Sequence, residues 1–129
     1  MRRTMILLMA GAFALAACSS GPPVRISSTG SIKIVEPKTG ARIEGDSFTI
    51  KVDVEGATIL EKAQKEIRPD TGHVHILVDG AVVNLLAGLE STVEDLEPGT
   101  HLIEAEFTAA DHGGFNPRVL DRITVRVVG

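Results

Sequence analysis

Hydrophobic and polar side chains alternate strictly along several short stretches of this chain, and this alternation constrains its fold more than any other feature. The clearest stretch runs from Ser47 to Glu55. Its apolar residues are Phe48, Ile50, Val52 and Val54, and its polar ones are Thr49, Lys51, Asp53 and Glu55. Successive side chains of a β-strand point to opposite faces, so such a stretch buries one face and exposes the other. The pattern therefore predicts a β-sheet protein.

Turn residues divide the chain into about seven stretches that are typical of strands. They cover residues 32–37, 47–55, 73–79, 81–86, 90–95, 100–108 and 119–128. Short strands at this spacing are typical of an immunoglobulin-like antiparallel β-sandwich. Long amphipathic helices do not alternate with them, which disfavours a parallel α/β sheet. The fold class is therefore predicted to be all-β, in one domain.

One segment, residues 58–68, breaks the alternation. Its apolar residues fall on one helical face, and its charges are spaced for pairs four residues apart, such as Glu61 with Lys65. Those apolar residues are Ile59, Leu60, Ala63 and Ile67. Pro69 would end a helix here. The sequence therefore predicts one short helix over one end of the sandwich.

The first 17 residues have the features of a cleaved signal peptide. Arg2 and Arg3 form a basic start, residues 5–14 are apolar, and small residues precede Cys18. The apolar run is too short to cross a ~30 Å hydrocarbon core as a helix. Residues 18–31 are rich in Ser, Gly and Pro, a composition that favours a flexible tether. The sandwich is accordingly assigned to residues 32–129.

The segment Leu15-Ala16-Ala17-Cys18 resembles the lipobox of bacterial lipoproteins. The resemblance implies lipidation of the Cys18 thiol, cleavage before it, and acylation of the new amino terminus, with palmitate among the acyl groups. Two or more acyl chains hold a protein stably on a membrane. We therefore expect an extracytoplasmic protein of the bacterial cell envelope, on either membrane or on the cell surface. The alternative is an ordinary secreted protein with a cysteine near its cleavage site.

Charge and composition exclude several functions. Removal of Arg2 and Arg3 with the signal peptide leaves 11 basic and 17 acidic side chains, so no basic stripe remains for nucleic acid. The chain has no Trp or Tyr, which disfavours a carbohydrate-stacking face. It has no Gly-x-Ser-x-Gly elbow or Gly-rich phosphate loop, and lipidation would consume its one thiol. We expect a non-enzymatic protein.

Three of the four histidines are expected to meet at one end of the sandwich. His73 and His75 lie two apart on one strand, so they share a face. In an immunoglobulin-type order, that strand and the strand of residues 100–108 are antiparallel neighbours. His112, just past the end of the second strand, should therefore lie near His73 and His75. His101 begins that strand and should lie at the opposite end.

Such a cluster has the composition of a metal site. Three imidazoles with an open position suit copper or zinc, and Asp111 or Asp70 would be the additional oxygen donors. The mature chain contains no Met, which argues against a thioether Cu(I) site. The alternative is that histidines at strand ends serve as hydrogen-bonded structural residues.

Short motifs in the second half of the chain resemble known families. Gly72-His73-Val74-His75, Pro98-Gly99-Thr100-His101 and Asp111-His112 resemble a group of secreted bacterial domains of uncharacterised function. Leu96 to His101 also resembles the penultimate strand of bacterial immunoglobulin-like modules. Asp111-His112 before the last strand resembles CopC-type copper-resistance proteins, which implies copper as a ligand. That family uses an N-terminal histidine, where this chain would carry a lipidated cysteine.

Two functions follow from these observations. The first is a non-enzymatic interaction or accessory module, held on the membrane by lipid and bound to another envelope protein. The second is a copper-binding protein that uses His73, His75 and His112.

Overall fold

The computed structural model describes residues 21, 24–86 and 88–129, so the proposed lipidation site, Cys18, lies outside the described residues. The described part of the chain is built from strands. They are β1 (Ser31–Glu36), β2 (Ala41–Glu44), β3 (Phe48–Glu55), β4 (Thr58–Ile59), β5 (Thr71–Val78), β6 (Ala81–Leu86), β7 (Glu90–Val93), β8 (Gly99–Ala109) and β9 (Gly114–Val128). All seven predicted strands are present, and β2 and β4 are additional.

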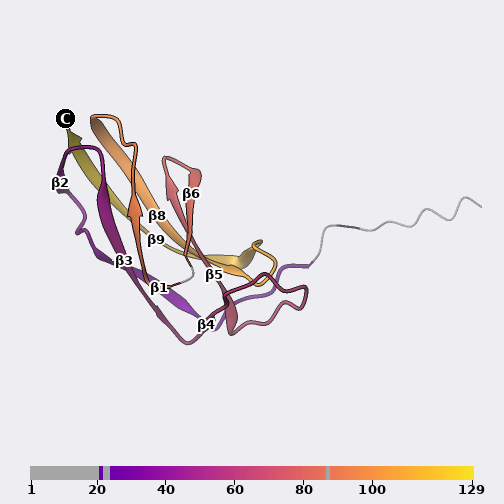
Figure 1. Ribbon diagram of the computed structural model, residues 1–129. Helices are drawn as coiled ribbons and strands as arrows, with labels where there is room; N and C mark the ends of the chain where they lie inside the picture. The colour runs from indigo at the N-terminus through magenta and orange to yellow at the C-terminus, as the bar shows by residue number, and fades with distance from the viewer. Residues whose placement is uncertain (1–20, 22–23, 87) are drawn as a thin grey trace, which may run out of the picture.

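The strands form two sheets that pack face to face (Figure 1). One sheet has the order β1-β3-β7, and the other has the order β2-β9-β8-β5-β4, with β6 also paired to β5. The pairs β2–β9 and β4–β5 are parallel and all other pairs are antiparallel. The predicted all-β immunoglobulin-like sandwich is therefore confirmed, although two short parallel pairs extend it.

The core lies between the two sheets, where the alternating apolar residues meet. Ile50 and Val52 of β3 and Val74 and Ile76 of β5 belong to one buried hydrophobic cluster, and all four are at most 3% exposed. Phe107 of β8 is fully buried and its ring stacks on that of Phe115, with centroids 5.6 Å apart. The apolar residues of the alternating stretches thus form the face of each sheet that is buried against the other sheet.

The helix predicted for residues 58–68 is wrong. Thr58 and Ile59 form β4, and residues 60–70 run as turns and irregular chain. The amide of Leu60 donates to the Gly72 carbonyl at 2.7 Å, and that of Gln64 donates to the Ala110 carbonyl at 2.9 Å. A helix this short is marginal in water, and these bonds to neighbouring chain segments replace the hydrogen bonds that a helix would form internally.

Within the described residues, no helix has the length and hydrophobicity to cross a membrane.

The second half of the expected tether lies against the sandwich. The Arg25 guanidinium donates from Nε to the Gly114 carbonyl at 2.7 Å, and the Asn116 amide donates to the Ile26 carbonyl at 2.9 Å. The Ser28 hydroxyl donates to the Pro69 carbonyl at 2.8 Å. The structure thus holds the chain from Arg25 onward on the same rim as the β8–β9 turn (Figure 1).

The close approach of β5 and β8 requires glycine at position 72. Gly72 is buried and lies opposite Ala109. A Cβ added there would be 1.9 Å from the carbonyl oxygen of Thr108 and 3.0 Å from the Phe107 ring. Any side chain would therefore push the two strands apart.

We predict that Gly72→Ala lowers the free energy of unfolding by about 2–3 kcal/mol, as overpacking of a core does. Urea denaturation of the soluble form (residues 19–129) measures this. Gly88→Ala is the matched control, because a Cβ there meets nothing within 4 Å. Equal stability of the two variants would contradict the inferred steric constraint.

Candidate functional site

The predicted histidine cluster is assembled on the outer face of β5. Val74 and Ile76 face the core, which turns His73 and His75 to the other side of the sheet. These two histidines are nevertheless only 5% and 8% exposed. His112, the chain after β4 and the end of β6 cover them, and these residues line a hollow of about 260 Å³. Its lining is Leu60, Glu61, Ala63, His73, Leu85, Leu86 and His112.

The three predicted histidines do come together, and their rings stack. The His112 ring lies 4.1 Å from the His73 ring and 5.3 Å from the His75 ring, centroid to centroid, with interplanar angles of 14° and 22°. His75 Nε2 is 3.0 Å from His112 Nδ1. His73 Nε2 is turned to the Ala110 carbonyl, 3.2 Å away. Only His75 and His112 therefore direct ring nitrogens at each other.

The β8–β9 turn places His112 over β5. Its backbone is closed by a bond from the Ala109 amide to the Gly113 carbonyl at 2.8 Å. His112 itself has φ +66°, in the left-handed region that side-chain-bearing residues rarely adopt. The adjacent Asp111 accepts a bond from the Gly113 amide at 3.0 Å. This turn is what brings a residue from beyond the end of β8 back over the neighbouring strand.

The contact between His75 and His112 prevents both rings from being protonated together. One nitrogen must donate and the other must accept, so at least one of the two rings is neutral. Burial lowers the pKa of His75, and the neighbouring His112 lowers it further. The lowered pKa favours the neutral form of His75, which is the form in which a histidine binds metal.

The carboxylates near the cluster are engaged by arginines. Both Asp111 oxygens accept bonds from Arg25, at 2.8 and 3.0 Å, and this pairing lowers the pKa of Asp111 to about 2. Glu106, opposite His75 in the strand register, is held by Arg118 through two bonds of 2.8 Å. Asp70, the other predicted oxygen donor, pairs with Arg68 on the exposed chain before β5, and this lowers its pKa.

This arrangement differs from the metal site that we predicted. Among residues 21, 24–86 and 88–129, no group of three or more His, Cys, Asp or Glu side chains is arranged to hold a metal ion. The histidines stack instead of directing three nitrogens at one point, and the proposed oxygen donors are bound to guanidinium groups. What the geometry does offer is one pair of facing imidazole nitrogens.

His101 lies at the other end of the sandwich, as expected. Its Nδ1 is 2.6 Å from the Asp79 carboxylate and its Nε2 is 2.7 Å from the Glu97 carbonyl. Both ring nitrogens thus face acceptors, which suits the protonated form. The Asp79 carboxylate raises the pKa of His101 accordingly. This histidine fastens the β7–β8 turn to the end of β5.

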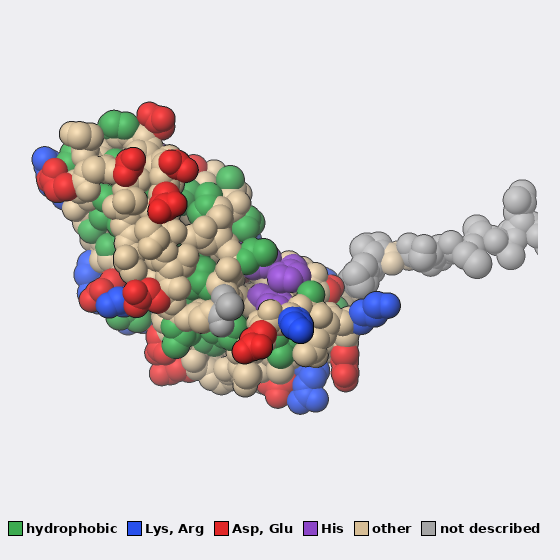
Figure 2. All heavy atoms as spheres, in the orientation of Figure 1, with side chains coloured by type: hydrophobic (Ala, Val, Ile, Leu, Met, Phe, Trp, Pro, Cys, Tyr) green, Lys and Arg blue, Asp and Glu red, His purple; other side chains and the backbone are tan. Residues whose placement is uncertain are grey.

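A second surface feature was not identified from the sequence. β6 lies at the edge of its sheet and exposes three apolar side chains. Val82 is 53% exposed, Val83 46% and Leu85 62%. The signal was available, because Ala81–Leu86 contains one polar residue and does not alternate. Figure 2 shows hydrophobic side chains along this edge, next to the purple histidines.

Comparisons with known proteins support the fold. No protein-family model and no curated protein matches the chain. Fibronectin(III)-like modules of Clostridium thermocellum CbhA are similar in structure, with 21% identity, a TM-score of 0.51, and coverage of 74% of this chain and 94% of that one. An engineered protein is 20% identical, with a TM-score of 0.49 over 78% of this chain and 20% of that one. The first likeness shows that the sandwich is fibronectin III-like.

Proposed function

We propose that this protein is a non-enzymatic, lipid-anchored module of the bacterial cell envelope that binds another envelope protein through β6. The exposed apolar edge formed by Val82, Val83 and Leu85 carries this proposal. Edge strands usually carry charges or proline that discourage pairing, yet Ala81–Leu86 has neither. A fibronectin III-like sandwich as the scaffold is consistent with a binding role.

Covering this edge supplies part of the free energy that recognition requires. Full burial of a Val or Leu side chain stabilises by about 1.5–3 kcal/mol. Because the three β6 side chains are about half exposed, covering them contributes roughly 3 kcal/mol in total. An extended partner segment would add backbone hydrogen bonds along the strand edge. The bound partner would thus be recognised by strand addition and by apolar contacts together.

Anchoring is tested by fractionation of cells that express the full chain. We predict that Cys18→Ala moves the protein from the membrane fraction to the soluble extract, because the thiol that carries the diacylglycerol is gone. Ser20→Ala, two residues away, should leave it in the membrane and is the control. Membrane retention of Cys18→Ala to the wild-type extent would contradict the lipid anchor.

Docking through β6 is tested by photocrosslinking in intact cells. A photoreactive benzoylphenylalanine at Val83 should give one discrete adduct, and the same residue at Lys33, exposed on β1 of the other sheet, should give none. Adding Leu85→Lys should lower the Val83 adduct at least about tenfold, since burying a charge there costs more than 1.4 kcal/mol. Equal adducts from both positions, or no effect of Leu85→Lys, would contradict the proposal.

A second candidate function, copper binding, is favoured by the spacing of two nitrogens. Nitrogens bound to one metal at ~2.0–2.1 Å and at right angles are ~2.9 Å apart. His75 Nε2 and His112 Nδ1 are 3.0 Å apart, beside a solvent-accessible hollow. A Cu(II) ion would replace the hydrogen bond between them.

This candidate predicts that His75→Ala weakens Cu(II) binding by the soluble form at least about tenfold, because one of two imidazole ligands is lost. Isothermal titration at pH 7 measures it. His101→Ala should bind as wild type does, because His101 lies at the other end of the sandwich. Wild-type protein that binds no Cu(II), or an equal loss in His101→Ala, would eliminate the metal function.

A further inference from the structure

We infer that the rim of the sandwich formed by residues 60–70 and the β8–β9 turn faces the lipid bilayer, so that the histidine hollow opens close to the headgroups. This rests on the proposed lipidation of Cys18. The partner in this inference is an anionic lipid surface, and the observations that support it are the point of chain attachment, the length of the tether and the distribution of charge.

The point of attachment is Arg25. Its guanidinium donates to both Asp111 oxygens and to the Gly114 carbonyl, so one side chain fastens the N-terminal segment to both sides of the β8–β9 turn. The pairing is partly shielded, with 23% and 34% of the Arg25 and Asp111 side chains exposed. A Cβ on Gly113 would lie 2.5 Å from this guanidinium, so the turn and the arginine are in close contact. The chain is therefore held on the sandwich from Arg25 onward rather than from Ser31 onward.

The remaining tether is short compared with the sandwich. From Cys18 to Arg25 there are seven residue steps, which span at most ~25 Å when fully extended. β8, with 11 residues, is ~37 Å long at 3.4 Å per residue. The greatest possible distance from Cys18 to Arg25 is thus shorter than β8. This keeps the Arg25 rim at the membrane.

Charge separates the two rims. Residues 60–70 expose Lys62, Lys65 and Arg68, balanced by an equal number of carboxylates. The opposite rim is acidic, with exposed carboxylates in the turns around β2 and between β7 and β8. They are Glu44, Asp46, Glu94, Asp95 and Glu97, against Arg42 and Arg126. Anionic headgroups repel this acidic rim. They do not repel the rim of residues 60–70, where positive and negative side chains are equal in number.

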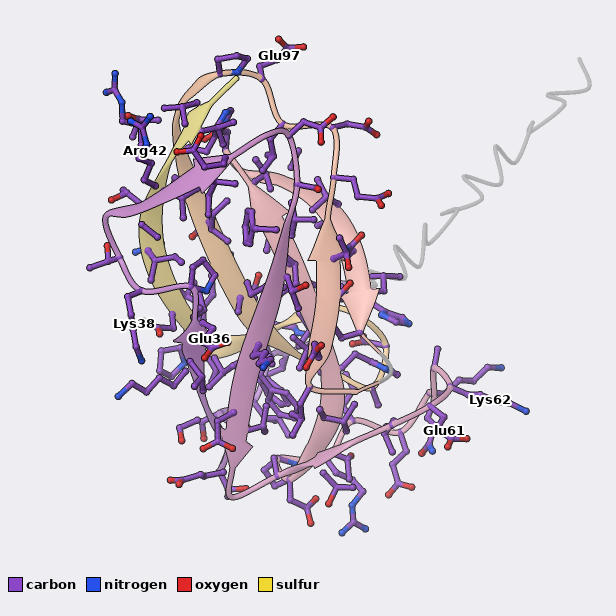
Figure 3. All side chains as sticks on the ribbon, turned by 60° about the vertical axis from the view of Figure 1, so that its left-hand side comes forward. Glu36, Lys38, Arg42, Glu61, Lys62 and Glu97 are labelled. Carbon is purple, nitrogen blue, oxygen red and sulfur yellow. The ribbon has the colours of Figure 1, made fainter. Side chains whose placement is uncertain are left out.

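Figure 3 shows how far apart the two rims lie. Glu97 projects from one end of the sandwich, and Glu61 and Lys62 project from the loop at the other end. Leu60 is half-buried in the hollow beside the histidines, two residues before Lys62. Apolar side chains next to lysines are the combination that fits a headgroup region. The histidine cluster would therefore act at the membrane surface.

Tryptophan fluorescence tests this orientation, because the chain contains no Trp or Tyr and one introduced Trp is the only strong emitter. The lipidated full-length protein is purified from bacterial membranes as Lys62→Trp, Lys65→Trp or Glu97→Trp. Each is reconstituted into phosphatidylethanolamine/phosphatidylglycerol vesicles with a nitroxide-labelled headgroup lipid. We expect quenching at positions 62 and 65 to exceed that at position 97 at least about threefold.

Lipidation is read separately from the intact mass of each protein. A lipidated protein with equal quenching at both rims, or with stronger quenching at position 97, would overturn the orientation and leave the lipid anchor intact. A mass without acyl groups at Cys18 would overturn the anchor and the orientation together. Arg25→Ala should reduce the difference between positions 62 and 97, whereas Arg42→Ala, which breaks an exposed pair on the other rim, should not.

Discussion

The pairing of β5 with β8 is the interaction on which the rest of the structure depends. β5 is buried on both faces, and its register sets His73 against Thr108 and His75 against Glu106. Gly72 allows the close approach, since the Thr108 carbonyl occupies the space of a Cβ. This pairing places the β8–β9 turn above β5. The histidine hollow, the Arg25 contact and the rim that we propose to face the membrane all follow from that placement.

The sequence predicted the sandwich because alternation is a local signal of burial. β3 shows this directly, with Ile50 and Val52 in the core and Lys51 and Asp53 exposed. β2 and β4 are too short for alternation to be recognised, and each is ordered by parallel pairing with a distant strand. The failed helix has the same origin. Its amides bond to Gly72 and Ala110, which local periodicity does not reveal.

The meeting of His73, His75 and His112 followed from strand order, and the structure brings them together. Their ring orientation did not follow, because it depends on the left-handed backbone of His112 and on the bond from His73 to Ala110. Nor did the sequence indicate that Arg25 would bind Asp111, a contact between residues 86 positions apart. Ion pairs between residues far apart in the chain leave no periodic signal in the sequence. The sequence therefore did not predict that Arg25 would occupy the expected oxygen donor Asp111, or that it would hold the N-terminal segment on the sandwich.

We propose that β6 is covered by another envelope protein when lipid anchors the module to a membrane. Hydrogen–deuterium exchange compares β6 amides of the lipidated protein in native membranes with those of the isolated soluble form. Strand addition would protect edge amides that are otherwise exchanging with water. The account predicts slower exchange in Ala81–Leu86 on the membrane and unchanged exchange in Ser31–Glu36. Identical exchange of Ala81–Leu86 in the two states would contradict it.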